Sequence, residues 1–96
     1  MHMGTDAKLE AQLAALFEEA GNAHHQAFTE SGGDDPEWPL WYADYLHEKL
    51  SKALGAGFTR SELVYLLVMV AKEQALRAPG ANWARYYARF FATRYT

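Results

Sequence analysis

The chain has 96 residues, half of them hydrophobic and 15% aromatic, so it is long enough to bury a core as one domain and too apolar to be largely disordered. It contains no cysteine, which excludes disulfides, thiolate metal sites and cysteine nucleophiles. The formal net charge of −3 argues against general affinity for nucleic acid, which normally needs a basic surface.

Hydropathy also indicates the cellular location of the protein. No stretch reaches the ~18 apolar residues of a membrane span, and the first residues lack the basic-then-apolar pattern of a signal peptide. No glycine-rich phosphate loop or other cofactor motif is present. We therefore expect residues 1–96 to form a single helical domain in the cytoplasm, with no cofactor and no membrane contact.

The first predicted helix covers about residues 6–29. Its core positions return at steps of three and four residues, as they do on one face of a helix. They are Leu9, Leu13, Leu16, Phe17, Ala20, His24, Ala27 and Phe28. Gly21 interrupts this pattern and weakens the helix without having to break it. The polar and glycine residues from Thr29 to Gly33 end it.

Two prolines introduce the second predicted helix, at about residues 39–54. Pro36 predicts a turn, and Pro39 suits the first turn of a helix because its missing amide costs nothing there. Leu46 and Leu50 define the core side of this helix. Trp41 therefore falls on roughly the opposite side, and the helix stops at the glycines from residue 55 onward.

The third predicted helix, about residues 60–78, contains the most apolar run of the chain, from Leu63 to Ala71. Thr59 and Glu62 have the spacing of a capping box, in which each side chain bonds the backbone amide of the other. Because the run has no polar face, we expect this helix to be buried in the middle of the fold.

The last predicted helix, about residues 83–95, follows Asn82, which is a suitable N-cap. It is rich in aromatic rings and needs a surface to pack on. Four helices with mostly short connections predict an all-α fold, either a compact four-helix array around the buried third helix or an up-down bundle.

Two histidines precede a segment with three closely spaced large aromatic residues. The pattern His24-His25 followed by Trp38-Pro39-Leu40-Trp41-Tyr42-Ala43 resembles small bacterial α-helical proteins that have the same double His and Trp-Pro-x-Trp-Tyr-Ala segment. The resemblance covers about the middle third of the chain. It implies a helical fold and brings no activity with it.

His24 has two interpretations. On the core face of the first helix it is a packed, hydrogen-bonded residue; alternatively it belongs to a metal or acid/base site. Candidate catalytic residues are His24, His47 and Glu73, and candidate metal ligands are His24, Asp35 and Glu37, with Asp34 as a further carboxylate. Metal-binding motifs such as His-Glu-x-x-His are absent. Glu73 could instead pair with Arg77 four residues on.

Aromatic residues suggest a recognition surface. The candidate partner-binding residues are Trp38, Trp41 and Tyr45 of the second helix and Tyr87 and Phe91 of the fourth, with Arg85 and Arg89 between the rings. Exposed aromatic patches usually mark interfaces, so we expect a homo-oligomer or another protein as partner. Arginine interleaved with rings would also suit single-stranded RNA, against which the acidic balance argues.

The sequence thus predicts a small interaction module acting through the aromatic surfaces of the second and fourth helices. The alternative is a small-ligand or metal-dependent enzyme with a pocket near His24, Asp35, Trp38, His47 and Glu73.

Overall fold

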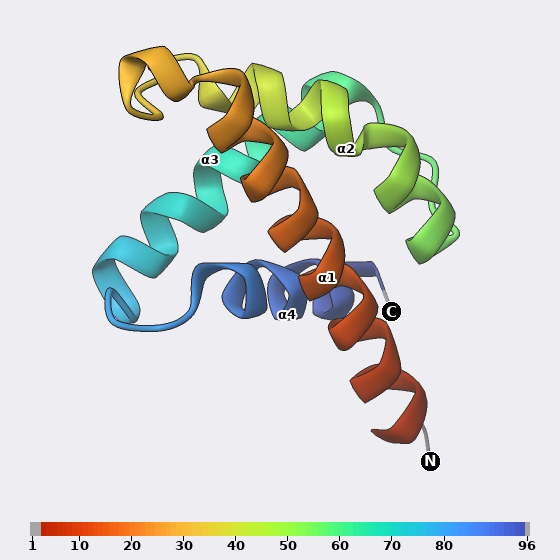
Figure 1. Cartoon of the computed structure of the whole chain (residues 1–96). Coiled ribbons are helices and arrows are strands. Elements are labelled where there is room, and N and C mark those ends of the chain that lie inside the picture. Colours follow the sequence, from red (N-terminus) through yellow and green to blue (C-terminus); the bar gives the residue numbers. More distant parts are fainter. Residues whose placement is uncertain (1–2, 96) are drawn as a thin grey trace.

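A computed structural model describes the backbone of residues 3–95 and the side chains of residues 7–95 (Figure 1). The ends of the predicted 1–96 domain, residues 1, 2 and 96, lie outside the described residues. Four α-helices pack against one another: α1 (Met3–Ala27), α2 (Trp38–Leu54), α3 (Arg60–Arg77) and α4 (Trp83–Tyr95). A short 3-10 helix, η1 (Thr29–Ser31), follows α1. The all-α prediction is confirmed, and the described residues contain no strand.

The helix ends follow from local chemistry. The predicted capping box closes the start of α3, where the Glu62 amide donates to the Thr59 hydroxyl and the Thr59 amide donates to the Glu62 carboxylate. Asn82 caps α4 by accepting the amide of Arg85 at 3.0 Å. Gly55 ends α2 in the left-handed conformation (φ 61°), where a side chain would be strained. Three of the four helices begin within one residue of the predicted position, and α1 begins three residues earlier.

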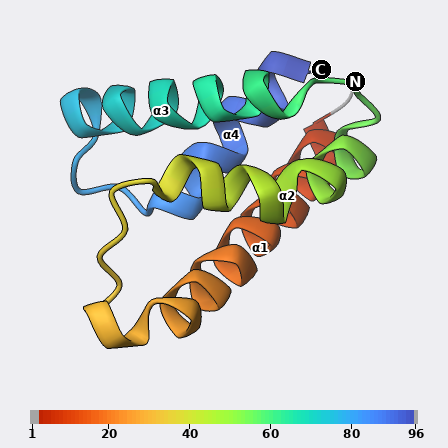
Figure 2. The ribbon, with the colours of Figure 1, turned by 90° about the horizontal axis from the view of Figure 1, so that it is seen from above.

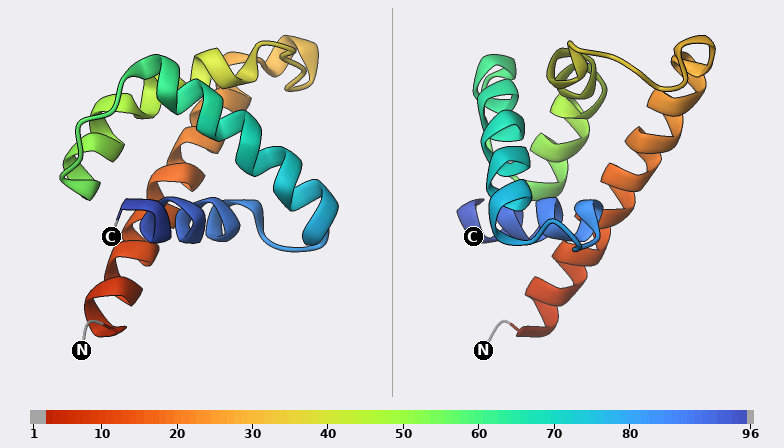
Figure 3. Two further views of the ribbon diagram at one scale, coloured as in Figure 1. Left: turned by 180° about the vertical axis from the view of Figure 1, so that it is seen from behind. Right: turned by 90° about the vertical axis from the view of Figure 1, so that its left-hand side faces the viewer.

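The helices cross rather than run in parallel. α4 lies across α1, and the first turns of α1 project beyond it (Figures 1 and 3). Seen from above, α2 and α3 lie beside each other, with α1 and α4 next to them (Figure 2). α1 is packed against both α2 and α4, so the first helix meets the last one. The array prediction is confirmed in preference to the up-down bundle.

One core fills the space between the helices. Its fully buried large side chains are Leu13 and Phe17 of α1, Leu46 and Leu50 of α2, Leu63, Leu66, Leu67 and Val70 of α3, and Phe91 of α4. α3 supplies four of these residues, but it is covered on one side only. Its outer side exposes Tyr65 by 65% and Leu76 by 86%. The prediction of a buried third helix is confirmed for its inner side, but the expectation that other elements would surround it is not met at Tyr65 and Leu76.

Candidate ligand pocket

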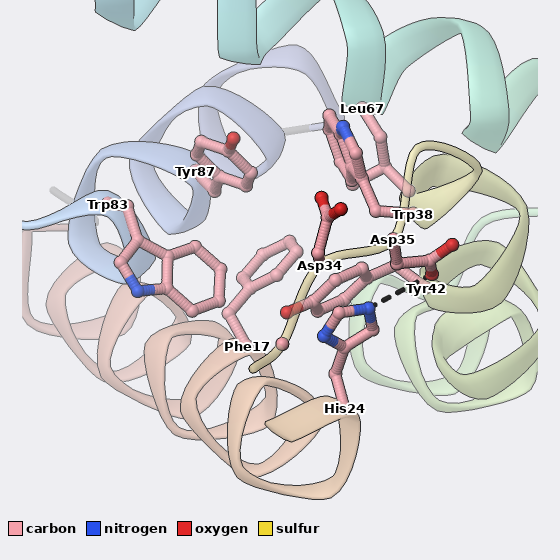
Figure 4. Close-up of a pocket in the computed structure, with 10 residues that line it drawn as sticks. Phe17, His24, Asp34, Asp35, Trp38, Tyr42, Leu67, Trp83 and Tyr87 are labelled. Atoms are coloured by element: carbon pink, nitrogen blue, oxygen red, sulfur yellow. Dashed lines mark hydrogen bonds and ion pairs between the residues drawn. The ribbon is translucent and has the colours of Figure 1, made fainter. Parts of the chain in front are cut away.

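A cavity of ≈ 410 Å³ lies between α1, α4 and the connection that joins α1 to α2 (Figure 4). This volume is within the range typical of small-molecule sites. Residues from all four helices and from the connection line it: Phe17, His24, Gly33, Asp34, Asp35, Trp38, Tyr42, Leu67, Trp83 and Tyr87. Five of the ten are aromatic rings, and two are carboxylates.

His24 is held at one side of this cavity by a hydrogen bond to Asp35. Its Nε2 lies 3.0 Å from Oδ2 of Asp35, and both side chains are only 10% exposed. A carboxylate only accepts hydrogen bonds, which assigns the imidazole proton to Nε2. The ring is stacked between Phe28, at 4.6 Å between centroids, and Tyr42, at 5.0 Å. The prediction that His24 lies on the core face of its helix is confirmed, since the residue is 8% exposed.

The connection from Phe28 to Glu37 carries the two acidic residues into place. The Phe28 carbonyl accepts the amide of Gly33 at 2.8 Å, and the Ser31 hydroxyl lies within hydrogen-bond distance of the carbonyls of Phe28 and Asp34 and can donate to either. Asp35 then uses both oxygens, Oδ2 for His24 and Oδ1 for the amide of Glu37 at 3.1 Å. The loop is therefore folded onto the helix by its own backbone bonds and by the pair with His24.

Asp34 differs from its neighbour. Its carboxylate points into the cavity between the rings of Tyr87 and Trp38 (Figure 4). It makes no hydrogen bond or ion pair with the rest of residues 7–95, and the residue is exposed. A carboxylate directed at an open space is available to a ligand, whereas the Asp35 carboxylate is already occupied.

Trp83 forms a wall of the cavity from the start of α4. Its ring meets Phe17 at 74°, Tyr42 at 76° and Tyr87 at 81°, with centroids between 5.3 and 6.3 Å apart. The indole reaches α1 at Gly21, where an added Cβ would come 2.9 Å from Cζ2 of Trp83. Gly21 therefore stands in the middle of a helix because this ring needs its space.

Burial raises the pKa of two tyrosines in the wall. The pKa of Tyr42 lies above its ordinary value of 10.0 because the phenol is desolvated and, second, because the negative charge of Asp35 is near. The pKa of Tyr87 is raised chiefly by burial, with a smaller contribution from Tyr42. Both phenols therefore remain neutral hydrogen-bonding groups around neutral pH.

A second hollow adjoins the first and shares His24, Gly33, Tyr42 and Trp83 with it. It adds another carboxylate, Glu18, on α1. The residues that line the two hollows include three acidic side chains and no lysine or arginine. The surroundings of the cavity are therefore negative.

The structure brings together only part of the predicted pocket. His24, Asp35 and Trp38 line the cavity, but His47 and Glu73 do not. His47 donates from Nε2 to the carbonyl of Phe58 at 2.6 Å and so joins α2 to the start of α3. Glu73 accepts the hydroxyl of Tyr86 at 2.7 Å between α3 and α4. The predicted pocket therefore differs from the cavity in including these two residues.

The predicted partner-binding residues have separate locations. Trp41 and Tyr45 are half-buried and stacked at 5.3 Å, and the Tyr45 hydroxyl donates to Glu19 at 2.7 Å on α1. Tyr87 is buried beside the cavity, and Phe91 is 0% exposed, which leaves it no surface to offer a partner. Arg85 and Arg89 are exposed on α4.

Of the candidate metal ligands, His24 and Asp35 meet, but Glu37 does not join them in a group of three. Glu37 contributes its backbone amide, not its carboxylate, to the Asp35 turn. Among the residues whose side chains are described, no three His, Asp or Glu form a group that could hold a metal ion. No helix within residues 3–95 combines the length and apolarity needed to cross a membrane.

Sequence reasoning missed four walls of the cavity: Phe17, Tyr42, Leu67 and Trp83. Aromatic and aliphatic side chains such as these usually indicate packing in the core, not a binding site. The one available signal was Gly21, since a glycine within an otherwise regular helix often marks the close approach of another group.

Comparisons with protein-family models, with curated proteins and with solved structures found no match for this chain. What the cavity can bind must therefore be argued from its geometry.

Proposed function

We propose that this chain is a binding domain for a small organic molecule, which enters the cavity beside His24. One observation carries the proposal: the Asp34 carboxylate, unpaired within the described side chains, points into a ring-lined space of ≈ 410 Å³. An apolar pocket with a few convergent polar groups is the usual form of a small-molecule site. The adjacent His24–Asp35 pair fixes the loop that carries this carboxylate.

The burial of α4 favours this function over an interaction surface on the second and fourth helices. Phe91 is enclosed and Tyr87 is nearly so, so two of the predicted contacts are used inside the molecule. Tyr45 is engaged with Glu19, and Lys49 lies 5.3 Å from its ring centroid. These rings contribute mainly to holding α2 and α4 on α1.

The three tryptophans supply an internal control for the test. Trp38 and Trp83 line the cavity and Trp41 does not. In NMR spectra of protein titrated with a library of cationic, neutral and anionic fragments, a ligand in the cavity should shift the indole N–H signals of Trp38 and Trp83 more than that of Trp41. Single Trp→Phe variants assign the three signals. If no fragment at millimolar concentration produces this pattern, the proposal is wrong.

A second candidate keeps the predicted role in association but moves it to α3. Tyr65 and Leu76 are about three helical turns apart and therefore lie on the same outer side of the helix, with Lys72 between them. Large exposed apolar residues in one row suit a second copy of the chain. Leu76→Glu should then shift a dimer to monomer in native mass spectrometry, while Leu40→Glu on α2 should not. A monomeric wild-type protein at high concentration would contradict this role.

A further inference from the structure

We infer that the ligand is a small organic cation with a methylated ammonium head, bound between Asp34 and the aromatic walls. This inference rests on the proposed binding function and adds the chemical class of the ligand. It follows from three independent properties of the cavity: its charge, its aromatic walls, and the small number of side-chain groups that could bind a metal ion.

Charge sets the sign of the ligand. The Asp35 carboxylate is paired with His24, but that of Asp34 has no partner among the described side chains and faces the open space. Glu18 adds a further negative charge at the adjoining hollow, and no lysine or arginine lines either one. A ligand with a carboxylate or phosphate would meet repulsion here, whereas a cation would neutralise a charge that the protein leaves unpaired.

The walls decide which kind of cation fits. Trp83 meets Phe17, Tyr42 and Tyr87 at angles of 74° to 81°, and Trp38 meets Tyr42 at 79°. Trp83 is exposed and Trp38 and Tyr42 are partly exposed, so these three rings keep surface that a guest can reach, whereas Phe17 is fully buried and lies behind them. Aromatic faces attract cations through their negative quadrupole, and cages of this kind bind quaternary ammonium groups.

The groups available around the cavity exclude a metal ion as the preferred occupant. A small hard cation holds its water tightly and needs several oxygen or nitrogen ligands in return. No such group of three is present among the described side chains, and one of the two carboxylates is already bound to His24. A methylated ammonium is weakly hydrated and needs only ring surface and one counter-charge, which the cavity supplies.

The test compares choline with 3,3-dimethylbutan-1-ol, its uncharged carbon isostere. Binding is measured by isothermal titration calorimetry and by the shifts of the tryptophan indole N–H signals. In the wild-type protein choline should bind at least about tenfold more tightly than the isostere, and its affinity should fall as salt is raised. Equal affinity of the two compounds, or tighter binding of the isostere, would overturn the inference.

Two variants and one control test whether the Asp34 charge and the Trp83 ring bind the ligand. Asp34→Asn keeps the backbone bonds of the loop and should reduce choline affinity by about tenfold with no change for the isostere. Glu30→Gln removes the same charge from exposed η1, away from the cavity lining, and should change neither. Trp83→Leu should weaken choline more than the isostere, because leucine keeps an apolar wall for both compounds and removes the aromatic face that attracts a cation.

The outcomes separate the two proposals. If neutral or anionic fragments shift the Trp38 and Trp83 signals and choline does not, the binding function stands and the cation inference falls. Should no fragment of any charge bind there, both are refuted. If choline binds but Asp34→Asn and Glu30→Gln reduce its affinity equally, the interaction is with the general negative field and the assigned site is wrong.

Discussion

Replacing Gly21 by alanine separates the stability of the helix from the shape of the cavity. Gly21 lies inside α1, where glycine costs about 0.5–1 kcal/mol relative to alanine because its unfolded backbone is more flexible. The added methyl group would stand 2.9 Å from Cζ2 of Trp83. An ordinary carbon–carbon contact is about 3.5–4.0 Å, so the indole must move by roughly 0.5–1 Å.

The cost of this movement is limited by where Trp83 lies. The residue is 36% exposed and its side chain has two rotatable bonds, so the ring can shift toward solvent. The shift weakens edge contacts with Phe17, Tyr42 and Tyr87, each worth about 0.5–1.5 kcal/mol when fully made. Partial loss of these contacts offsets the gain in the helix, so we expect Gly21→Ala to change the free energy of unfolding by less than about 1 kcal/mol.

The same substitution should alter the cavity clearly. Denaturant unfolding measures the stability change, and near-ultraviolet circular dichroism with the Trp83 indole signal measures the ring displacement. Ala23→Gly, two residues on in α1, is the control: it should cost about 0.5–1 kcal/mol and leave the Trp83 signal in place. The reasoning is refuted if Gly21→Ala leaves the Trp83 signal unchanged, or if it destabilises the protein by more than about 2 kcal/mol.

Three further substitutions test the contacts that hold the fold and the loop. Asp35→Ala should cost about 1.5–3 kcal/mol in urea unfolding because it leaves His24 without its charged partner, and a loss below about 0.5 kcal/mol would contradict the pair. Thr59→Ala removes the N-cap of α3 and should cost about 1 kcal/mol, with Ser61→Ala near zero as control; equal costs would rule out the cap. Burial and then Asp35 raise the pKa of Tyr42, so above pH 10.0 the unfolded chain loses a proton that the folded one keeps. Stability should therefore fall as pH rises through this range, and Tyr42→Phe should flatten the fall; an unchanged slope would show that another group titrates.

Local chemistry explains why the helices were predictable. A capping box, a proline in the first turn and a glycine after the last turn each act within a few residues, so they are visible in the sequence. The bond between Thr59 and Glu62 was predicted with both partners. His24 was likewise placed on the core face by its four-residue spacing from Ala20 and from Phe28.

The cavity was harder to predict because it depends on which helices meet. Nothing near Trp83 indicates that it packs on Gly21, which lies three helices earlier in the chain. Phe91 was assigned to a surface because rings occur all round α4, and a single helix pattern cannot show that α1 and α3 both pack against it. The partner of Glu73 was missed for the same reason, since Tyr86 comes from the next helix.

The pairing of α1 with α4 also has a kinetic consequence. α2 and α3 are joined by a few residues, so their contact closes a short loop, whereas the contact between α1 and α4 closes a loop that contains both other helices and costs more chain entropy. We therefore expect the α1–α4 contact to form later. Contacts that form late contribute to the barrier against unfolding and little to the folding rate. Because Trp83 and Phe17 belong to this late pair, a molecule held between them should slow unfolding and leave the rate of folding almost unchanged.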